Sequence, residues 1–155
     1  MSMKSIISFL YCFICIQLFA CCNERIGMTG SNNNVLHTDS MKLKITIGTS
    51  VFTATLYNNP TVTAFKTRLP MTINMRDLNA NEKYFDLPDN LPANASNPGA
   101  IQAGDLMFYG SNTLVLFYKS FSTSYNYTPM GRVDDIAELT AALGSGNVTV
   151  TFALK

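Results

Sequence analysis

The sequence from Met41 to the C-terminus consists of short runs in which apolar and polar residues alternate, separated by turn-forming residues. In the run from Lys42 to Ile47 every second residue is Leu or Ile, and the run from Phe52 to Tyr57 repeats this pattern. Because successive side chains of a strand point to opposite faces, such runs predict half-buried β-strands joined by tight turns. Further strands are expected near residues 71–75, 83–87, 104–109, 113–119, 129–133 and 146–152.

Two segments have a helical pattern instead. The first is expected over residues 60–69, where an asparagine precedes a proline at the start and a second proline follows the end. The second is expected to follow Asp134 or Asp135 as its cap and to stop at Gly144. Its apolar stripe would consist of Ile136, Leu139 and Leu143. The expected element order is ββαβββββαβ.

These elements predict a mainly β protein with antiparallel strand pairing. Eight strands in an open sheet would expose two edges, whereas closure into a barrel removes both of them. We therefore predict a closed eight-stranded antiparallel barrel that is capped by two short helices. Residues 88–99 are rich in proline and asparagine and are expected to form a long surface loop.

The distribution of cysteine and histidine excludes several kinds of chemistry. The cysteines are Cys12, Cys15, Cys21 and Cys22, and the single histidine is His37. The segment from Met41 onward therefore has no residue for a thiol nucleophile, a disulfide, a Cys/His zinc site or a histidine base. The net charge of +1 disfavours nucleic acid, whose binding needs clustered Lys and Arg. We expect no metal, no cofactor and no nucleic-acid partner.

The N-terminal residues are typical of an export signal. A mostly apolar stretch, residues 6–20, follows Lys4; it is too short for a membrane-spanning helix but suits a signal peptide. Leu18-Phe19-Ala20-Cys21 resembles the bacterial lipobox, in which the cysteine is acylated and becomes the first residue. We predict a lipoprotein signal peptide over residues 1–20 and a lipid on Cys21. Ordinary secretion after a cut near Ala20 is the alternative.

The following residues, 21–40, are polar and rich in asparagine and glycine, with no hydrophobic period. They are expected to form a flexible tether, because they offer too little apolar surface to offset the cost of ordering them. Residues 41–155 would then form one globular domain. The lipid would hold this domain in the cell envelope, on the periplasmic or surface face of a bacterial membrane.

Aromatic residues are concentrated between residues 108 and 127. Strand alternation sends some of these rings inward, and core packing is the favoured interpretation for Phe108. The stretch from Ser120 to Tyr127 is polar as well as aromatic, so its rings are expected at the barrel rim, where they would either bind a ligand or fold over the barrel end. The candidate cleft residues are Tyr84, Phe85, Phe108, Phe121, Tyr125 and Tyr127.

The element order and several segments resemble cyclophilins, and more closely the bacterial cyclophilin-like domain proteins. The segments that carry the resemblance are residues 59–70, 81–85, 102–110, 131–133 and 143–147. Together they extend over nearly all of residues 41–155. The resemblance implies the same closed barrel with two helices.

What the resemblance implies about activity depends on a missing arginine. Cyclophilins that isomerise prolyl bonds carry a Phe-His-Arg run on the strand after the first helix and its loop, and the arginine stabilises the twisted transition state. The matching stretch here is expected at residues 84–87, Tyr-Phe-Asp-Leu, where neither His nor Arg is present. A carboxylate or an aliphatic side chain cannot replace that donor. Catalysis would therefore need an arginine from another strand, and the candidates are Arg68, Arg76 and Arg132.

The favoured function is a membrane-anchored, non-catalytic module that binds a peptide or a small molecule. The alternative is a divergent peptidyl-prolyl isomerase that acts on exported proteins. A third and weaker hypothesis is an accessory role for a redox partner, because domains of this branch are similar to ones that occur beside flavodoxin-like proteins.

Overall fold

The structure, a computed structural model, describes residues 41–155. The predicted signal peptide, the predicted lipid site at Cys21 and the predicted tether at residues 21–40 lie outside the described residues and stay predictions. None of the helices in the described part of the chain has the length and apolar character needed to cross a membrane.

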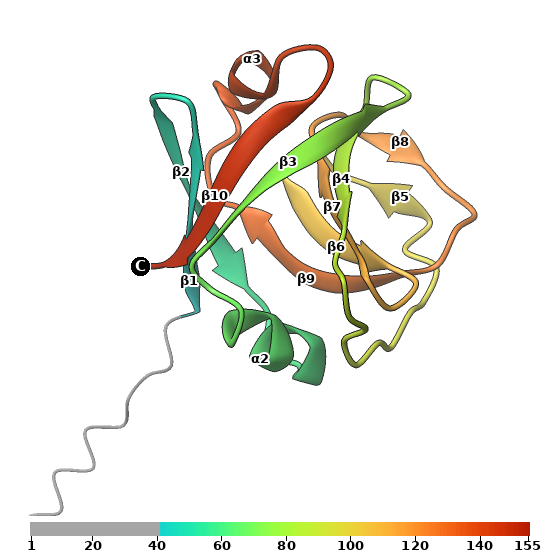
Figure 1. Ribbon diagram of the computed structural model, residues 1–155. Helices are drawn as coiled ribbons and strands as arrows, with labels where there is room; N and C mark the ends of the chain where they lie inside the picture. The colour runs from blue at the N-terminus through green and yellow to red at the C-terminus, as the bar shows by residue number, and fades with distance from the viewer. Residues whose placement is uncertain (1–40) are drawn as a thin grey trace, which may run out of the picture. The chain divides into compact units, whose positions relative to one another are not determined.

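Eight antiparallel strands close into a barrel, as Figure 1 shows, so the predicted fold class is confirmed. In their order around the barrel, the strands are β1 (Lys42–Ile47), β10 (Val148–Leu154), β3 (Met71–Leu78), β4 (Glu82–Asp86), β7 (Thr113–Phe117), β6 (Asp105–Tyr109), β9 (Tyr127–Val133) and β2 (Ser50–Leu56). Since β2 pairs with β1, every strand of the described barrel has two neighbours. Closure thus protects the backbone groups that an open sheet would expose.

Two short helices lie at opposite ends of the barrel (Figure 1). The first, α2 (Pro60–Lys66), starts where the sequence predicts, because Asn59 Oδ1 accepts a hydrogen bond from the backbone N–H of Val62 at 2.9 Å. The second, α3 (Leu139–Leu143), is shorter than predicted and has no side-chain cap. Both of its leucines are buried.

The cap predicted for α3 is wrong. Asp134 accepts hydrogen bonds from Lys42 Nζ at 2.9 Å and from Thr55 Oγ1 at 2.5 Å, so its carboxylate is engaged with the outer face of the barrel. Asp135 caps only a turn, because it accepts from the backbone N–H two residues later. Ile136, which was expected in the apolar stripe, is 44% exposed. The helix therefore begins only where the next leucine reaches the core.

The structure also contains two strands that the sequence pattern did not predict. They are β5 (Ala100–Ile101) and β8 (Phe121–Ser122), which pair with each other as a separate two-stranded sheet. Ile101 and Phe121 pack with Val115 and Phe117 of β7 in a second hydrophobic cluster. This cluster fastens the small sheet to the barrel wall.

The main core fills the barrel and includes one aromatic side chain from α2. Phe65 is fully buried. Its ring meets Phe108 and Phe152 edge-on, with centroid distances of 6.5 and 6.3 Å. Because fully buried aromatic rings contribute strongly to core stability, Phe65 anchors α2 to the barrel.

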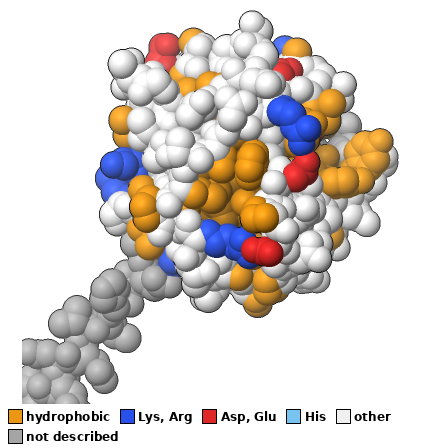
Figure 2. Space-filling model, in the orientation of Figure 1, with side chains coloured by type: hydrophobic (Ala, Val, Ile, Leu, Met, Phe, Trp, Pro, Cys, Tyr) orange, Lys and Arg blue, Asp and Glu red, His pale blue; other side chains and the backbone are white. Residues whose placement is uncertain are grey.

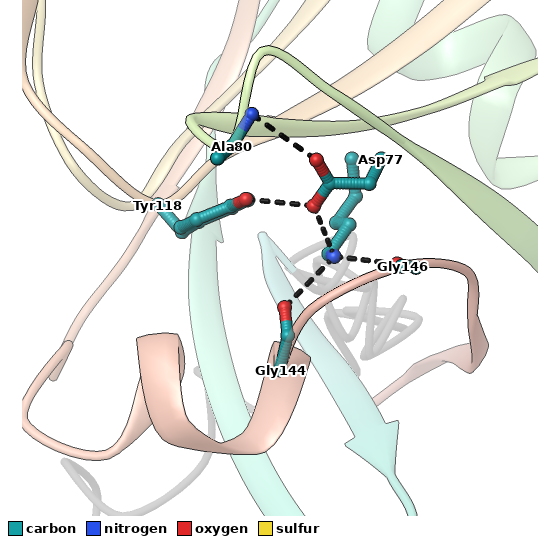
Figure 3. Close-up of polar contacts among 6 residues, drawn as sticks. Asp77, Ala80, Tyr118, Gly144 and Gly146 are labelled. Atoms are coloured by element: carbon teal, nitrogen blue, oxygen red, sulfur yellow. Dashed lines mark hydrogen bonds and ion pairs between the residues drawn. The ribbon is translucent and has the colours of Figure 1, made fainter.

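A buried lysine ties one end of the barrel together (Figure 3). Lys83 of β4 is fully buried, and its Nζ donates to Asp77 Oδ2 at 2.5 Å and to the carbonyls of Gly144 and Gly146 at 2.9 and 2.7 Å. The Tyr118 hydroxyl donates to the same Asp77 oxygen at 2.7 Å. The hydrogen bonds from Lys83 and Tyr118 lower the pKa of Asp77. The network joins β3 and β4 to the loop between α3 and β10.

Candidate functional site

A cavity of about 580 Å³ opens on the outer wall of the barrel. Outward-facing side chains of β4, β7, β6 and β9 form its base, and β8 with the residues after it, up to position 125, completes it. Neighbouring side chains on the same strands, such as Leu114 of β7, point into the main core instead. The base residues include Tyr84, Val115, Tyr109 and Tyr127. One layer of β-strand backbone therefore separates the cavity from the barrel interior.

The aromatic side chains at the cavity form a continuous series of ring contacts. Phe121 lies 5.7 Å from Phe117, which lies 5.5 Å from Tyr127, measured between ring centroids. Tyr127 is in turn 5.6 Å from Tyr109, and Tyr109 is 6.1 Å from Tyr125. Tilted and edge-on contacts of this kind stabilise the arrangement of the rings. The cavity thus has a preformed aromatic wall.

Four of the six predicted cleft residues line this cavity. They are Tyr84, Phe121, Tyr125 and Tyr127. They lie on the outer wall rather than at the rim of a barrel mouth, because the small β5–β8 sheet holds their stretch of chain against the barrel. Whether they bind a ligand stays a prediction.

The other two predicted residues lie elsewhere. Phe108 is fully buried in the main core, and Phe85 is partly buried against the same core. Each is a direct neighbour of an outward-facing tyrosine, Tyr109 or Tyr84, and alternation along the strand turns it to the opposite face. Phe85 and Phe108 support the barrel beneath the cavity but do not line it.

Glu82 lines the cavity and was not among the predicted residues. It is only 9% exposed, and none of the hydrogen bonds among the described residues reaches its carboxylate. Burial, and secondarily the negative charge of Asp77, raises the pKa of Glu82 to about 7. Its neighbour Asn81 also lines the cavity and has a buried Oδ1 without a hydrogen-bond partner. Alternation places Glu82 on the same face of β4 as Tyr84. This spacing of two residues is the sequence signal from which Glu82 could have been predicted at the cavity.

Arg76 lies next to the cavity wall. It belongs to β3, the strand that directly follows α2 and pairs with β4. Its Cζ is 4.7 Å from the centroid of the Tyr84 ring, and its Nη2 donates to Asp86 Oδ2 at 2.6 Å. Arg76 itself does not line the cavity. It holds one face of the Tyr84 ring.

The other two arginines are engaged away from Tyr84. Arg68 pairs with Asp89 at 3.3 Å, and Arg132 pairs with Asp105 at 2.7 Å. On the face of the molecule seen in Figure 2, oppositely charged side chains lie side by side around a hollow where hydrophobic side chains gather.

The cavity lining combines aromatic side chains with a few polar groups. Residues 41–155 contain no cluster of three or more His, Cys, Asp or Glu side chains that would hold a metal ion. The cavity offers aromatic faces, the hydroxyls of Ser122, Thr123 and Ser124, and the carboxyl of Glu82. A few polar groups on a largely aromatic wall are typical of sites that recognise small ligands.

Comparisons with known proteins agree with this architecture. A model of the cyclophilin-like family matches residues 45–153. The solution structure of the hypothetical protein AF2241 from Archaeoglobus fulgidus is similar, with a TM-score of 0.52 and 17% sequence identity over 75% of this chain and 95% of that chain. No curated protein matches the sequence. Since the family match extends over most of the sequence and the whole barrel apart from its outermost residues, the chain belongs to the cyclophilin-like family.

Proposed function

We propose that the protein is a non-catalytic module that binds a peptide segment or a small ligand in the cavity on the outer barrel wall. A lipid on Cys21 would hold the module in the cell envelope. The observation that carries this proposal is the cavity itself, whose aromatic residues are already held in contact with one another. A preformed wall reduces the entropy lost when a ligand binds.

The size and lining of the cavity support a binding role. Its volume of about 580 Å³ is that of a site for a small molecule or a few peptide residues. Tyrosine rings provide a large contact area with few rotatable bonds, and the hydroxyls of residues 122–124 can adapt to different polar partners. No step of this proposal needs a cofactor.

A divergent prolyl isomerase is the second candidate, and Arg76 is the observation in its favour. Its guanidinium lies against the Tyr84 ring, does not line the cavity and is already paired with Asp86. A donor that is held by a carboxylate is less able to stabilise a twisted prolyl bond. We therefore favour binding without turnover.

We expect the protein to leave the rate of prolyl isomerisation in an Ala-Pro peptide unchanged in a protease-coupled assay. The uncatalysed barrier is about 18–20 kcal/mol, and binding that is equal in the ground and transition states does not lower it. Arg76→Ala and Arg68→Ala provide a matched pair of variants. Acceleration that is lost in Arg76→Ala but kept in Arg68→Ala would establish the isomerase instead.

The anchor makes a separate prediction. Cys21→Ala should move the protein from the membrane fraction to the soluble fraction of the cell envelope, because a lipidated cysteine is the proposed attachment. Cys22→Ala is the control and should leave the protein with the membranes. Immunoblots of the two fractions measure the change. Recovery of the Cys21→Ala protein in the membrane pellet would exclude lipid attachment at this position.

A further inference from the structure

The side chains that line the cavity carry negative charge only. Glu82 and Asp86 contribute carboxyl groups, and the lining contains no Lys, Arg or His. Asp86 is compensated by Arg76 at 2.6 Å and also accepts from Thr113 Oγ1 at 2.8 Å. The uncompensated carboxyl among the described lining residues is therefore that of Glu82.

Glu82 lies where a carboxylate is costly without a partner. In the barrel it is opposite Phe117 of β7 on one side and Leu78 of β3 on the other. Its exposed fraction is 9%, so it is 91% buried. It receives no hydrogen bond from the described residues. An ionised carboxylate in such surroundings is stabilised by a positive charge placed within a few ångströms.

The aromatic rings around Glu82 also favour a positively charged group. Tyr84, Tyr109, Tyr125, Tyr127 and Phe121 line the cavity together with it. The faces of aromatic rings attract cations, and clusters of them are used in proteins to enclose quaternary ammonium groups. The wall and the carboxyl thus favour one ligand chemistry by two independent interactions.

We propose that the cavity binds the alkylammonium end of its ligand, with Glu82 as the counter-ion and the tyrosine rings as the enclosing wall. This inference rests on the proposed binding function and specifies the class of ligand. The ammonium group belongs either to a free amine or to a lysine side chain of a peptide, and the two sources share the same chemistry at the site.

The pH dependence follows from the groups around Glu82. Asp77 of β3, Tyr118 directly after β7, and Tyr127 of β9 interact electrostatically with it, and Asp86 shares the cavity. Both tyrosines have a raised pKa and stay neutral near pH 7. Since burial raises the pKa of Glu82 to about 7, the carboxyl ionises between about pH 6 and about pH 8. Affinity for a permanently charged cation should therefore rise about tenfold over this range.

The test compares choline with 3,3-dimethylbutanol, its neutral isostere, by titration of the full-length chain in detergent. We expect choline to bind about tenfold more tightly at about pH 8, with ring resonances of Tyr125 and Tyr127 shifting on binding. A capped lysine derivative compared with its norleucine counterpart tests the peptide source in the same way. Binding of either cation in preference to its isostere supports the proposal.

Glu82→Gln should remove both the preference for the cation and its pH dependence, whereas Glu138→Gln, at an exposed residue outside this cavity, should keep both. The first variant is expected to fold, because it removes a charge whose burial is costly. Equal binding of choline and its isostere would overturn the ammonium site and leave the binding module standing. If none of the four probes shifts the cavity resonances, both proposals fail together.

Discussion

Replacement of Asp77 by alanine should lower the free energy of unfolding by about 3–5 kcal/mol. The variant leaves the Lys83 ammonium fully buried, with two backbone carbonyls as acceptors but no counter-ion. It also removes the acceptor of the Tyr118 hydroxyl. Urea denaturation of the wild-type protein and the variant measures the difference.

The neighbouring residue provides a matched control. Arg76 and Asp86 form an ion pair whose side chains are 52% and 46% exposed, whereas the side chains of Lys83 and Asp77 are 0% and 19% exposed. Arg76→Ala should therefore cost at most about 1 kcal/mol. Similar losses in the two variants would show that the buried network does not hold this end of the barrel.

The loss of stability caused by Asp77→Ala should depend on pH in one direction. The pKa of Asp77 is lowered below its ordinary value of 3.8, first by the hydrogen bond from Lys83 and then by that from Tyr118. The folded state therefore favours the ionised carboxylate, and this stabilisation is present above about pH 4 and lost as the pH falls further. The stability difference between wild-type protein and Asp77→Ala should shrink in acid.

Phe65→Ala is expected to have an effect of similar size, about 3–5 kcal/mol, through a different cause. It removes a fully buried ring that contacts Phe108 and Phe152 and leaves a void where α2 meets the barrel. A lowered midpoint of thermal unfolding, followed by circular dichroism, measures the loss. Because Phe65 lies on the opposite side of the barrel wall from the cavity, ligand binding by the folded fraction should persist.

Phe121→Ala is the comparison for Phe65→Ala. Phe121 is only partly buried and belongs to the small cluster outside the barrel, so we expect a smaller loss of stability. The same variant should weaken ligand binding, because Phe121 lines the cavity. A larger loss of stability in Phe121→Ala than in Phe65→Ala would contradict the division between the two clusters.

The sequence predicted the barrel well because strand alternation and local caps are local signals. Asn59 before a proline was sufficient to place the start of α2. The start of α3 was misplaced because Asp134 is used by Lys42 and Thr55, which are distant in the sequence. A helix cap and a cross-barrel ion pair require the same residue type, and only the tertiary structure distinguishes them.

The candidate site was predicted only in part, because some of its residues have local sequence signals and others depend on tertiary contacts. Tyr125 and Tyr127 were found because a polar stretch that is rich in rings is unusual, whatever its contacts. Glu82 was missed because its surroundings come from other strands, with Leu78 of β3 and Phe117 of β7 lying opposite it. Arg76 was named together with Arg68 and Arg132, but the sequence did not single it out, because its contact with Tyr84 is a pairing between strands and not a local motif.

The alternation along β4 has a consequence for how such a protein can change over generations. Lys83 and Phe85 face inward and serve stability, while Glu82, Tyr84 and Asp86 face the cavity. Under the proposed binding function, substitutions on the second set would alter what is recognised without repacking the first. A single five-residue strand would thus let ligand preference diverge among descendants while the scaffold is inherited intact.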